Sequence, residues 1–272
     1  MAVKMMNVFA FLLLLLPCFS VTVAGLPAIF GSSAAQVYGR DTPSPDEVAP
    51  LAGSDNKTNI DYCGKADTPT FLTGKLNNEE GDSETGPGFY VTNNDISGEH
   101  FFLIENSRDT HPWKYLHDAS QVPIGARKFV QVCSTWQGRL MRGTPKVNTD
   151  GRVHNLGTWI ESSVVNGVMS GDVSFLQGCD GGAKVASNDG RGLTRGCTVD
   201  MLSGAPSDAL QTKDTGTPAL KRITGDGFSQ SAKNWDLSKC DASQVFIEES
   251  NLKPIIDSTN GRFEVTFYKG KA

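Results

Sequence analysis

Apolar residues that alternate with polar ones, in short segments separated by turns, constrain the fold of this chain more than any other feature. Near the carboxyl end, Phe263, Val265 and Phe267 alternate with polar residues and so present one apolar face, as a half-buried strand does. Val173 and Phe175 repeat the pattern. Further strands are expected over three other apolar segments, residues 100–106, 128–136 and 158–165.

Turn signals separate these segments. Asp-Gly and Asn-Gly pairs tolerate the positive φ of tight hairpins, and they occur six times, at residues 150–151, 166–167, 180–181, 189–190, 226–227 and 260–261. Helical periodicity is confined to short segments near residues 207–212 and 229–238. The pattern therefore predicts a mainly β fold, an antiparallel β-sandwich or barrel with loop-rich insertions.

Charge and motifs exclude several classes of function. The 272 residues contain 25 Lys and Arg against 30 Asp and Glu, and a net charge of −5 argues against a nucleic-acid-binding surface. The glycine-rich run at 178–184 breaks the phosphate-loop pattern and predicts a turn instead, and no serine-hydrolase elbow occurs. None of the histidines, His100, His111, His117 and His154, has metal-ligand spacing. We therefore expect no cofactor and no metal.

The amino terminus resembles a secretory signal peptide. Lys4 precedes a nine-residue apolar run, residues 8–16, and small residues at 22–24 offer a cleavage site. Such a run is too short to cross a bilayer of about 30 Å as a helix. Residues 1–24 are therefore predicted to be a signal peptide, which implies an extracellular or cell-wall protein with no membrane contact after cleavage.

The mature chain divides into two predicted parts. Residues 25–58 are rich in Ala, Ser, Pro and Gly, which is typical of a flexible leader or propeptide. Residues 59–272 are expected to form the folded domain, most simply a monomer. Asn56 begins the sequon Asn-Lys-Thr and is a candidate glycosylation site.

Export also determines how the cysteines are interpreted. Cys18 leaves with the signal peptide, and the mature cysteines are Cys63, Cys133, Cys179, Cys197 and Cys240. In an oxidising compartment, five thiols allow two disulfides and one free cysteine. Spacing alone leaves all possible pairings open.

Seven segments, in order, resemble those of thaumatin-like proteins of the pathogenesis-related family 5 type. They are residues 122–127 (VPIGAR), 138–142 (GRLMR), 157–161 (GTWIE), 171–178 (GDVSFLQG), 197–206 (CTVDMLSGAP), 237–242 (LSKCDA) and 259–267 (TNGRFEVTF). The resemblance covers roughly residues 100–272 and implies a thaumatin-like β-sandwich. It also implies a disulfide between Cys197 and Cys240. The chain departs from the family in having few cysteines, with Ala205 and Tyr268 at two cysteine positions.

The resemblance implies an acidic cleft that engages β-1,3-glucan-type polysaccharide. Glu161 and Asp172 match its catalytic carboxylates, Arg142 matches its arginine, and Asp200 is a further ligand-binding candidate. Glycoside cleavage needs two carboxyl groups with separated pKa values, one protonated and one ionised. Gln177 replaces one family aspartate, so part of the acidic set is missing, and weak or no hydrolysis is expected.

Structural alternatives exist for each candidate. Glu161 can be a solvated residue at a strand end, Asp172 can cap a turn, and Arg142 can pair with any surface acid. The tryptophans Trp113, Trp136 and Trp159 can stack on sugar rings or lie in the core. Two other functions remain open: a secreted interaction or effector-type protein acting at another organism's surface, and a cell-wall-associated structural protein.

Overall fold

The computed structural model describes residues 84–95, 100–106, 114–116, 125, 127–144 and 154–271. They all belong to one unit of the chain, Val48–Ala272. The predicted signal peptide, the leader at 25–58 and the sequon at Asn56 lie outside the described residues.

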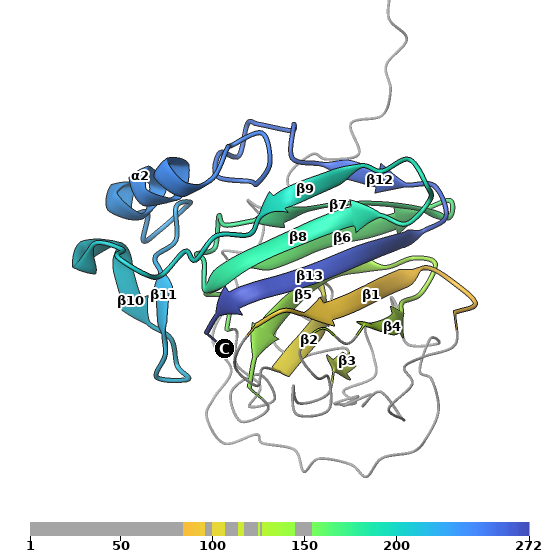
Figure 1. Ribbon diagram of the computed structural model, residues 1–272, viewed down its shortest axis with the longest axis horizontal. Coiled ribbons are helices and arrows are strands. Elements are labelled where there is room, and N and C mark those ends of the chain that lie inside the picture. The colour runs from red at the N-terminus through yellow and green to blue at the C-terminus, as the bar shows by residue number, and fades with distance from the viewer. Residues whose placement is uncertain are drawn as a thin grey trace, which may run out of the picture. The chain divides into compact units, whose positions relative to one another are not determined.

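Two β-sheets dominate the described part of the chain (Figure 1). The first sheet has five strands in the order β4-β1-β13-β8-β9, namely β4 (Arg127–Gln131), β1 (Gly88–Asn93), β13 (Arg262–Gly270), β8 (Gly181–Ser187) and β9 (Thr194–Cys197). The second has six strands in the order β12-β7-β6-β5-β2-β3, namely β12 (Ile256–Ser258), β7 (Val168–Ser174), β6 (Trp159–Val165), β5 (Gln137–Gly143), β2 (His100–Glu105) and β3 (Lys114–Leu116).

Smaller elements lie between β9 and β12. The 3₁₀ helix η3 (Ser207–Ala209) is followed by a two-stranded hairpin, β10 (Leu210–Thr212) and β11 (Pro218–Leu220), and by helix α2 (Gln230–Lys239). Ser229 caps α2 because its hydroxyl accepts a hydrogen bond from the Ala232 amide at 3.2 Å. Neither of the described helices is long and apolar enough to span a membrane.

The two large sheets share one hydrophobic core. Apolar side chains from both sheets belong to a single buried cluster, among them Phe89, Val130, Phe263 and Phe267 from the first sheet and Leu140, Ile160 and Val173 from the second. Two sheets that bury their inner faces against one another remove that apolar surface from water, which is the main favourable term in folding. The predicted mainly β fold is confirmed.

The strand arrangement differs from the prediction in one pairing. Strands β1 and β13 run parallel, with Phe89 opposite Phe263, so the first sheet is mixed rather than antiparallel. A parallel pair needs a long connection, and these strands lie near opposite ends of the described chain.

Several predicted segments match the observed elements, and others are shorter. The strand around Phe263 and the helix near 229–238 are present. The strand that begins near 128 ends at Gln131, and the expected helix near 207–212 is a 3₁₀ turn followed by β10. The run at 178–184, predicted to be a turn, contributes its second half to β8.

The turn between β6 and β7 determines how the residues of the candidate site pair across the hairpin. Asn166 and Gly167 both have positive φ, 51° and 79°, as a tight type I′ turn requires. The two residues join Val165 directly to its partner Val168. The turn therefore determines which residues lie opposite one another along the whole hairpin.

The disulfide between Cys197 and Cys240 joins β9 to the end of α2, as the resemblance implies. Its Cα atoms are 5.8 Å apart. Closing a loop of about 44 residues stabilises a fold by roughly 4 kcal/mol in the chain-entropy model. Cys133 is also disulfide-bonded, and Cys179 is a buried free thiol.

Candidate functional site

A pair of carboxyl groups lies at the centre of the β6–β7 hairpin. Glu161 and Asp172 are directly opposite one another in the antiparallel register. Such residues share one face, with Cβ atoms about 4.5–5.5 Å apart. Their neighbours Ile160 and Val173 belong to the core, so the two carboxyl groups lie on the outer face of the six-stranded sheet.

The two carboxyl groups occupy different surroundings. Asp172 is buried, and its Oδ1 atom has no hydrogen-bond partner. Burial raises the pKa of Asp172 well above its ordinary value, and the charge of Glu161 raises it further. Burial also raises the pKa of Glu161, but a hydrogen bond from Ser174 and the positive charge of Arg139 oppose that rise. Within the pair, the rise in the pKa of Asp172 therefore has no opposing partner, whereas the rise in the pKa of Glu161 is opposed.

Arg139 provides the counter-charge for this pair, although the resemblance assigned it no role. It lies on β5 opposite Glu161, and its guanidinium carbon is 4.3 Å from the centre of the Trp159 ring. Its Nη2 atom donates to Asn155 Oδ1 at 2.7 Å, and the Trp159 indole nitrogen donates to the Asn155 carbonyl at 2.9 Å. Stacking and these hydrogen bonds together hold the charge beside Glu161.

An apolar strip borders the carboxyl pair on the same face. Phe102, Ile104 and Met141 form a buried cluster on the outer face, and the half-buried Trp159 packs against it. Trp136, in contrast, lies in the main core. The candidate site thus combines two carboxyl groups with one partly accessible aromatic ring.

Arg142 does not join this site, although the resemblance placed it there. Alternation along β5 directs Arg139 and Met141 outward and Leu140 and Arg142 toward the core. The Arg142 side chain is fully buried, and its guanidinium group lies 4.8 Å from the centre of the Phe267 ring. Its Nη2 atom donates to the Gly182 carbonyl at 2.9 Å.

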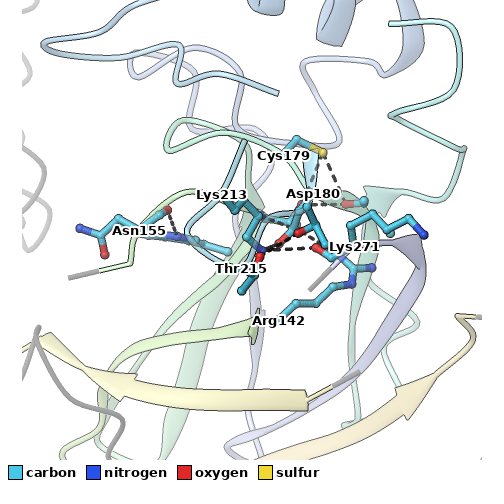
Figure 2. Close-up of polar contacts among 12 residues, drawn as sticks. Arg142, Asn155, Cys179, Asp180, Lys213, Thr215 and Lys271 are labelled. Carbon is cyan, nitrogen blue, oxygen red and sulfur yellow. Dashed lines mark hydrogen bonds and ion pairs between the residues drawn. The ribbon is translucent and has the colours of Figure 1, made fainter. Parts of the chain in front are cut away.

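A second acidic group, Asp180, accounts for the charge of Arg142. Arg142 Nη1 and Lys213 Nζ converge on the Asp180 carboxylate at 3.0 and 2.9 Å (Figure 2). Burial alone would raise the pKa of Asp180, but the charges of Lys213 and Arg142 hold it below its ordinary value. The Thr158 amide adds a hydrogen bond at 3.2 Å. This ion cluster joins β5, the start of β8 and the β10–β11 hairpin.

Asp200 also lies apart from the carboxyl pair. It forms an ion pair with Lys269 at 2.5 Å and accepts hydrogen bonds from the amides of Leu202 and Ser203. The hydrogen bond from Lys269 lowers the pKa of Asp200 most. These contacts stabilise the turn after β9, so we assign Asp200 a structural role rather than the ligand-binding role that we expected.

Among the described residues, no group of three or more His, Cys, Asp and Glu side chains is arranged to hold a metal ion. His154 lies beside Asp214, with Nδ1 and Oδ2 2.7 Å apart.

Comparison with known proteins finds a likeness in structure, without one in sequence. No model of a known protein family and no curated protein matches the chain. Among solved structures, it is similar to a laminaripentaose-producing β-1,3-glucanase in complex with laminaritetraose, with 17% identity and a TM-score of 0.33. The match covers 51% of this chain and 53% of that chain, about half of each. A likeness at this level carries no argument about activity.

Proposed function

We propose that this chain is a secreted, divergent thaumatin-like protein whose Glu161–Asp172 face engages a β-1,3-glucan-type polysaccharide, with weak or no hydrolysis. The observation that carries the proposal is the asymmetry of the pair. Asp172 is buried without a partner at Oδ1, whereas Glu161 has Ser174 and Arg139 to stabilise its charge. The signal-like amino terminus supports secretion, and the ordered motifs support the family.

A sugar chain has matching groups for this face. A protonated carboxyl donates a hydrogen bond, and an ionised one accepts from sugar hydroxyls. Trp159 offers part of an apolar ring beside them, and the flat face of a glucose ring is apolar enough to pack there. The pair and the aromatic ring therefore recognise the polar edge and the apolar face of one sugar unit.

The same geometry explains why we expect this face to bind a glucan but to hydrolyse it weakly or not at all. In a glycosidase, the two carboxyl groups flank the scissile bond at about 5–5.5 Å or about 6.5–9.5 Å from one another. Glu161 and Asp172 rise side by side from adjacent strands, so a sugar chain lies over both rather than between them. Any residual cleavage would use Asp172 as the proton donor and Glu161 as the base or nucleophile.

The proposal can be tested with insoluble β-1,3-glucan and with soluble laminarin. We expect the wild-type protein to be retained on the insoluble glucan and to release few reducing ends from laminarin. Replacing Glu161→Gln or Trp159→Ala should weaken retention about tenfold, the equivalent of losing one charge-assisted hydrogen bond or one ring contact.

Asp257→Asn is the matched control because Asp257 is an exposed acid on β12 of the same sheet. Retention of this variant should equal that of the wild type. If the wild-type protein does not bind any insoluble glucan, or if Asp257→Asn weakens binding as much as Glu161→Gln, the proposed function is wrong.

A further inference from the structure

Asn155 lies on the segment that leads into β6, and it contacts two residues of the candidate site. Its side-chain Oδ1 atom accepts a hydrogen bond from Arg139 Nη2 at 2.7 Å, and its backbone carbonyl accepts one from the Trp159 indole nitrogen at 2.9 Å. One residue therefore contacts both the cation and the aromatic ring that border the Glu161–Asp172 pair.

The charge of Arg139 serves the site only while it lies beside Glu161. The two residues are opposite one another in the register of β5 and β6, and this positive charge opposes the rise in the pKa of Glu161. An arginine side chain has many rotamers, and fixing one of them costs up to about 2 kcal/mol. Contacts that fix the side chain therefore decide how strongly the charge acts on the carboxyl group.

The contact with Asn155 supplies a direction that ring stacking does not. The guanidinium carbon of Arg139 is 4.3 Å from the centre of the Trp159 ring. Attraction to a ring face depends little on how the guanidinium group is rotated above the ring, whereas a hydrogen bond weakens steeply when its donor turns away from the acceptor. The 2.7 Å bond to Oδ1 therefore helps to set the rotation of the guanidinium group above the ring.

The backbone beside Asn155 is anchored to the buried ion cluster. A Cβ atom at Gly157 would lie 2.5 Å from Asp180 Oδ2, so only glycine allows this approach. The Thr158 amide donates to Asp180 Oδ1 at 3.2 Å, and the Thr158 hydroxyl donates to the Gly181 carbonyl at 2.7 Å. Because Asp180 is fully buried between two cations, the segment that carries Asn155 has a fixed support.

We propose that Asn155 is a positioning residue of the glucan-binding face, which holds the Arg139 guanidinium group over Trp159 and beside Glu161. This role rests on the proposed function, and Asn155 affects the glucan through Arg139 rather than by a step of its own. It also has a consequence that needs no glucan. Without the Asn155 side chain, the charge of Arg139 opposes the rise in the pKa of Glu161 less well, so that pKa should rise further.

Asn155→Ala removes Oδ1 but keeps the backbone carbonyl that accepts from Trp159, so it tests the contact with Arg139 alone. In the full mature protein, we expect a higher pKa of Glu161 by carbon-13 NMR, and retention on insoluble β-1,3-glucan that is weakened about threefold. Gln211→Ala is the matched control, because Gln211 carries an exposed amide beside the same pocket of about 170 Å³ that Asn155 lines. This control should change neither quantity.

Arg139→Met distinguishes this role from a merely structural one. If Asn155 acts through Arg139, adding Asn155→Ala to Arg139→Met should change neither the titration of Glu161 nor the retention any further. A residue that only supports the backbone would add the same effect in both backgrounds. Asn155→Asp keeps the shape of the side chain and an acceptor oxygen for Arg139, so its retention should stay within about twofold of the wild type.

The titration and the retention measurement can fail separately. Amide spectra that change only near Asn155 and Arg139 would show that each variant folds. The positioning role is wrong if Asn155→Ala leaves the pKa of Glu161 unchanged or lower, if it has the same effect in Arg139→Met, or if Asn155→Asp loses retention as Asn155→Ala does. If the pKa rises as expected but the wild-type protein does not bind insoluble glucan, the proposed function is wrong, although Asn155 still positions Arg139.

Discussion

Asp180 and Asp172 are both buried aspartates, yet the protein surrounds them in opposite ways. Asp180 receives two cations and a backbone amide, whereas Asp172 faces another carboxyl group and has an unpaired oxygen. The pKa of Asp180 is accordingly low and that of Asp172 is high. The first arrangement stabilises the fold, and the second favours the protonated form of the carboxyl group.

The two groups also give opposite dependence of stability on pH. Folding lowers the pKa of Asp180, so its ionised carboxylate stabilises the folded protein above about pH 4. This stabilisation is lost as the pH falls through the pKa that Asp180 has in the folded protein. Folding raises the pKa of Asp172. The folded protein therefore loses stability as the pH rises from about 4 through this raised pKa, because Asp172 must then ionise in a buried place. Stability should therefore be highest in mildly acidic solution if these two groups dominate.

The largest predicted effect comes from breaking the buried ion cluster. Asp180→Asn keeps the shape of the side chain but leaves Arg142 and Lys213 buried without their shared anion. Removing one partner from a buried ion pair costs about 3–5 kcal/mol. Urea unfolding at pH 7 measures the loss.

Asp214→Asn is the matched comparison for that variant. Asp214 lies at the tip of the β10–β11 hairpin and contacts His154, but its own side chain is 73% exposed. An exposed pair contributes about 0–1 kcal/mol. Equal losses in the two variants would contradict the distinction between a buried and an exposed pair.

A smaller effect is predicted for the counter-charge of the carboxyl pair. Arg139→Met keeps an apolar stem over Trp159 but removes the charge beside Glu161 and the donor to Asn155. We expect a loss of about 1–3 kcal/mol at pH 7 and a higher pKa for Glu161. The loss should shrink in acid, where Glu161 is protonated. A loss that does not change with pH would mean that Arg139 does not act through Glu161.

The smallest predicted effect is a gain in stability rather than a loss. Asp172→Asn removes a group whose ionisation is costly, so the variant should match or exceed wild-type stability at pH 8, by on the order of 1 kcal/mol. At pH 4, where Asp172 is protonated, the two proteins should be alike. A clear destabilisation at pH 8 would show that the ionised form of Asp172 has a partner.

Local patterns in the sequence predicted much of the fold, whereas Glu161 and Asp172 became candidates through the resemblance to thaumatin-like proteins. The Asn166-Gly167 turn and the alternation around Val173 are local signals, and together they place Glu161 opposite Asp172. Arg142 was misplaced because a motif match does not show which face of a strand a residue occupies. Arg139 occupies the outward face of the same strand, but the match of segment 138–142 assigned the cleft arginine to Arg142.

The ion cluster could not be predicted from local signals. Asp180 and Lys213 are 33 residues apart, and their contact depends on how the β10–β11 hairpin packs beside β8. The parallel pairing of β1 with β13 likewise depends on the path of the whole chain. Such contacts arise from tertiary packing, which periodicity and turn signals do not encode.

The central claim is that burial and the charge of Glu161 raise the pKa of Asp172 well above its ordinary value, while Ser174 and Arg139 oppose the rise at Glu161. Carbon-13 NMR of the side-chain carboxyl groups across pH 3 to 9, assigned with Glu161→Gln and Asp172→Asn, tests it directly. We predict that Asp172 titrates well above the ordinary range for aspartate and that Glu161→Gln brings its pKa down. If Asp172 titrates near pH 4, and its titration is unaffected by Glu161→Gln, the two carboxyl groups do not divide the roles of proton holder and anion.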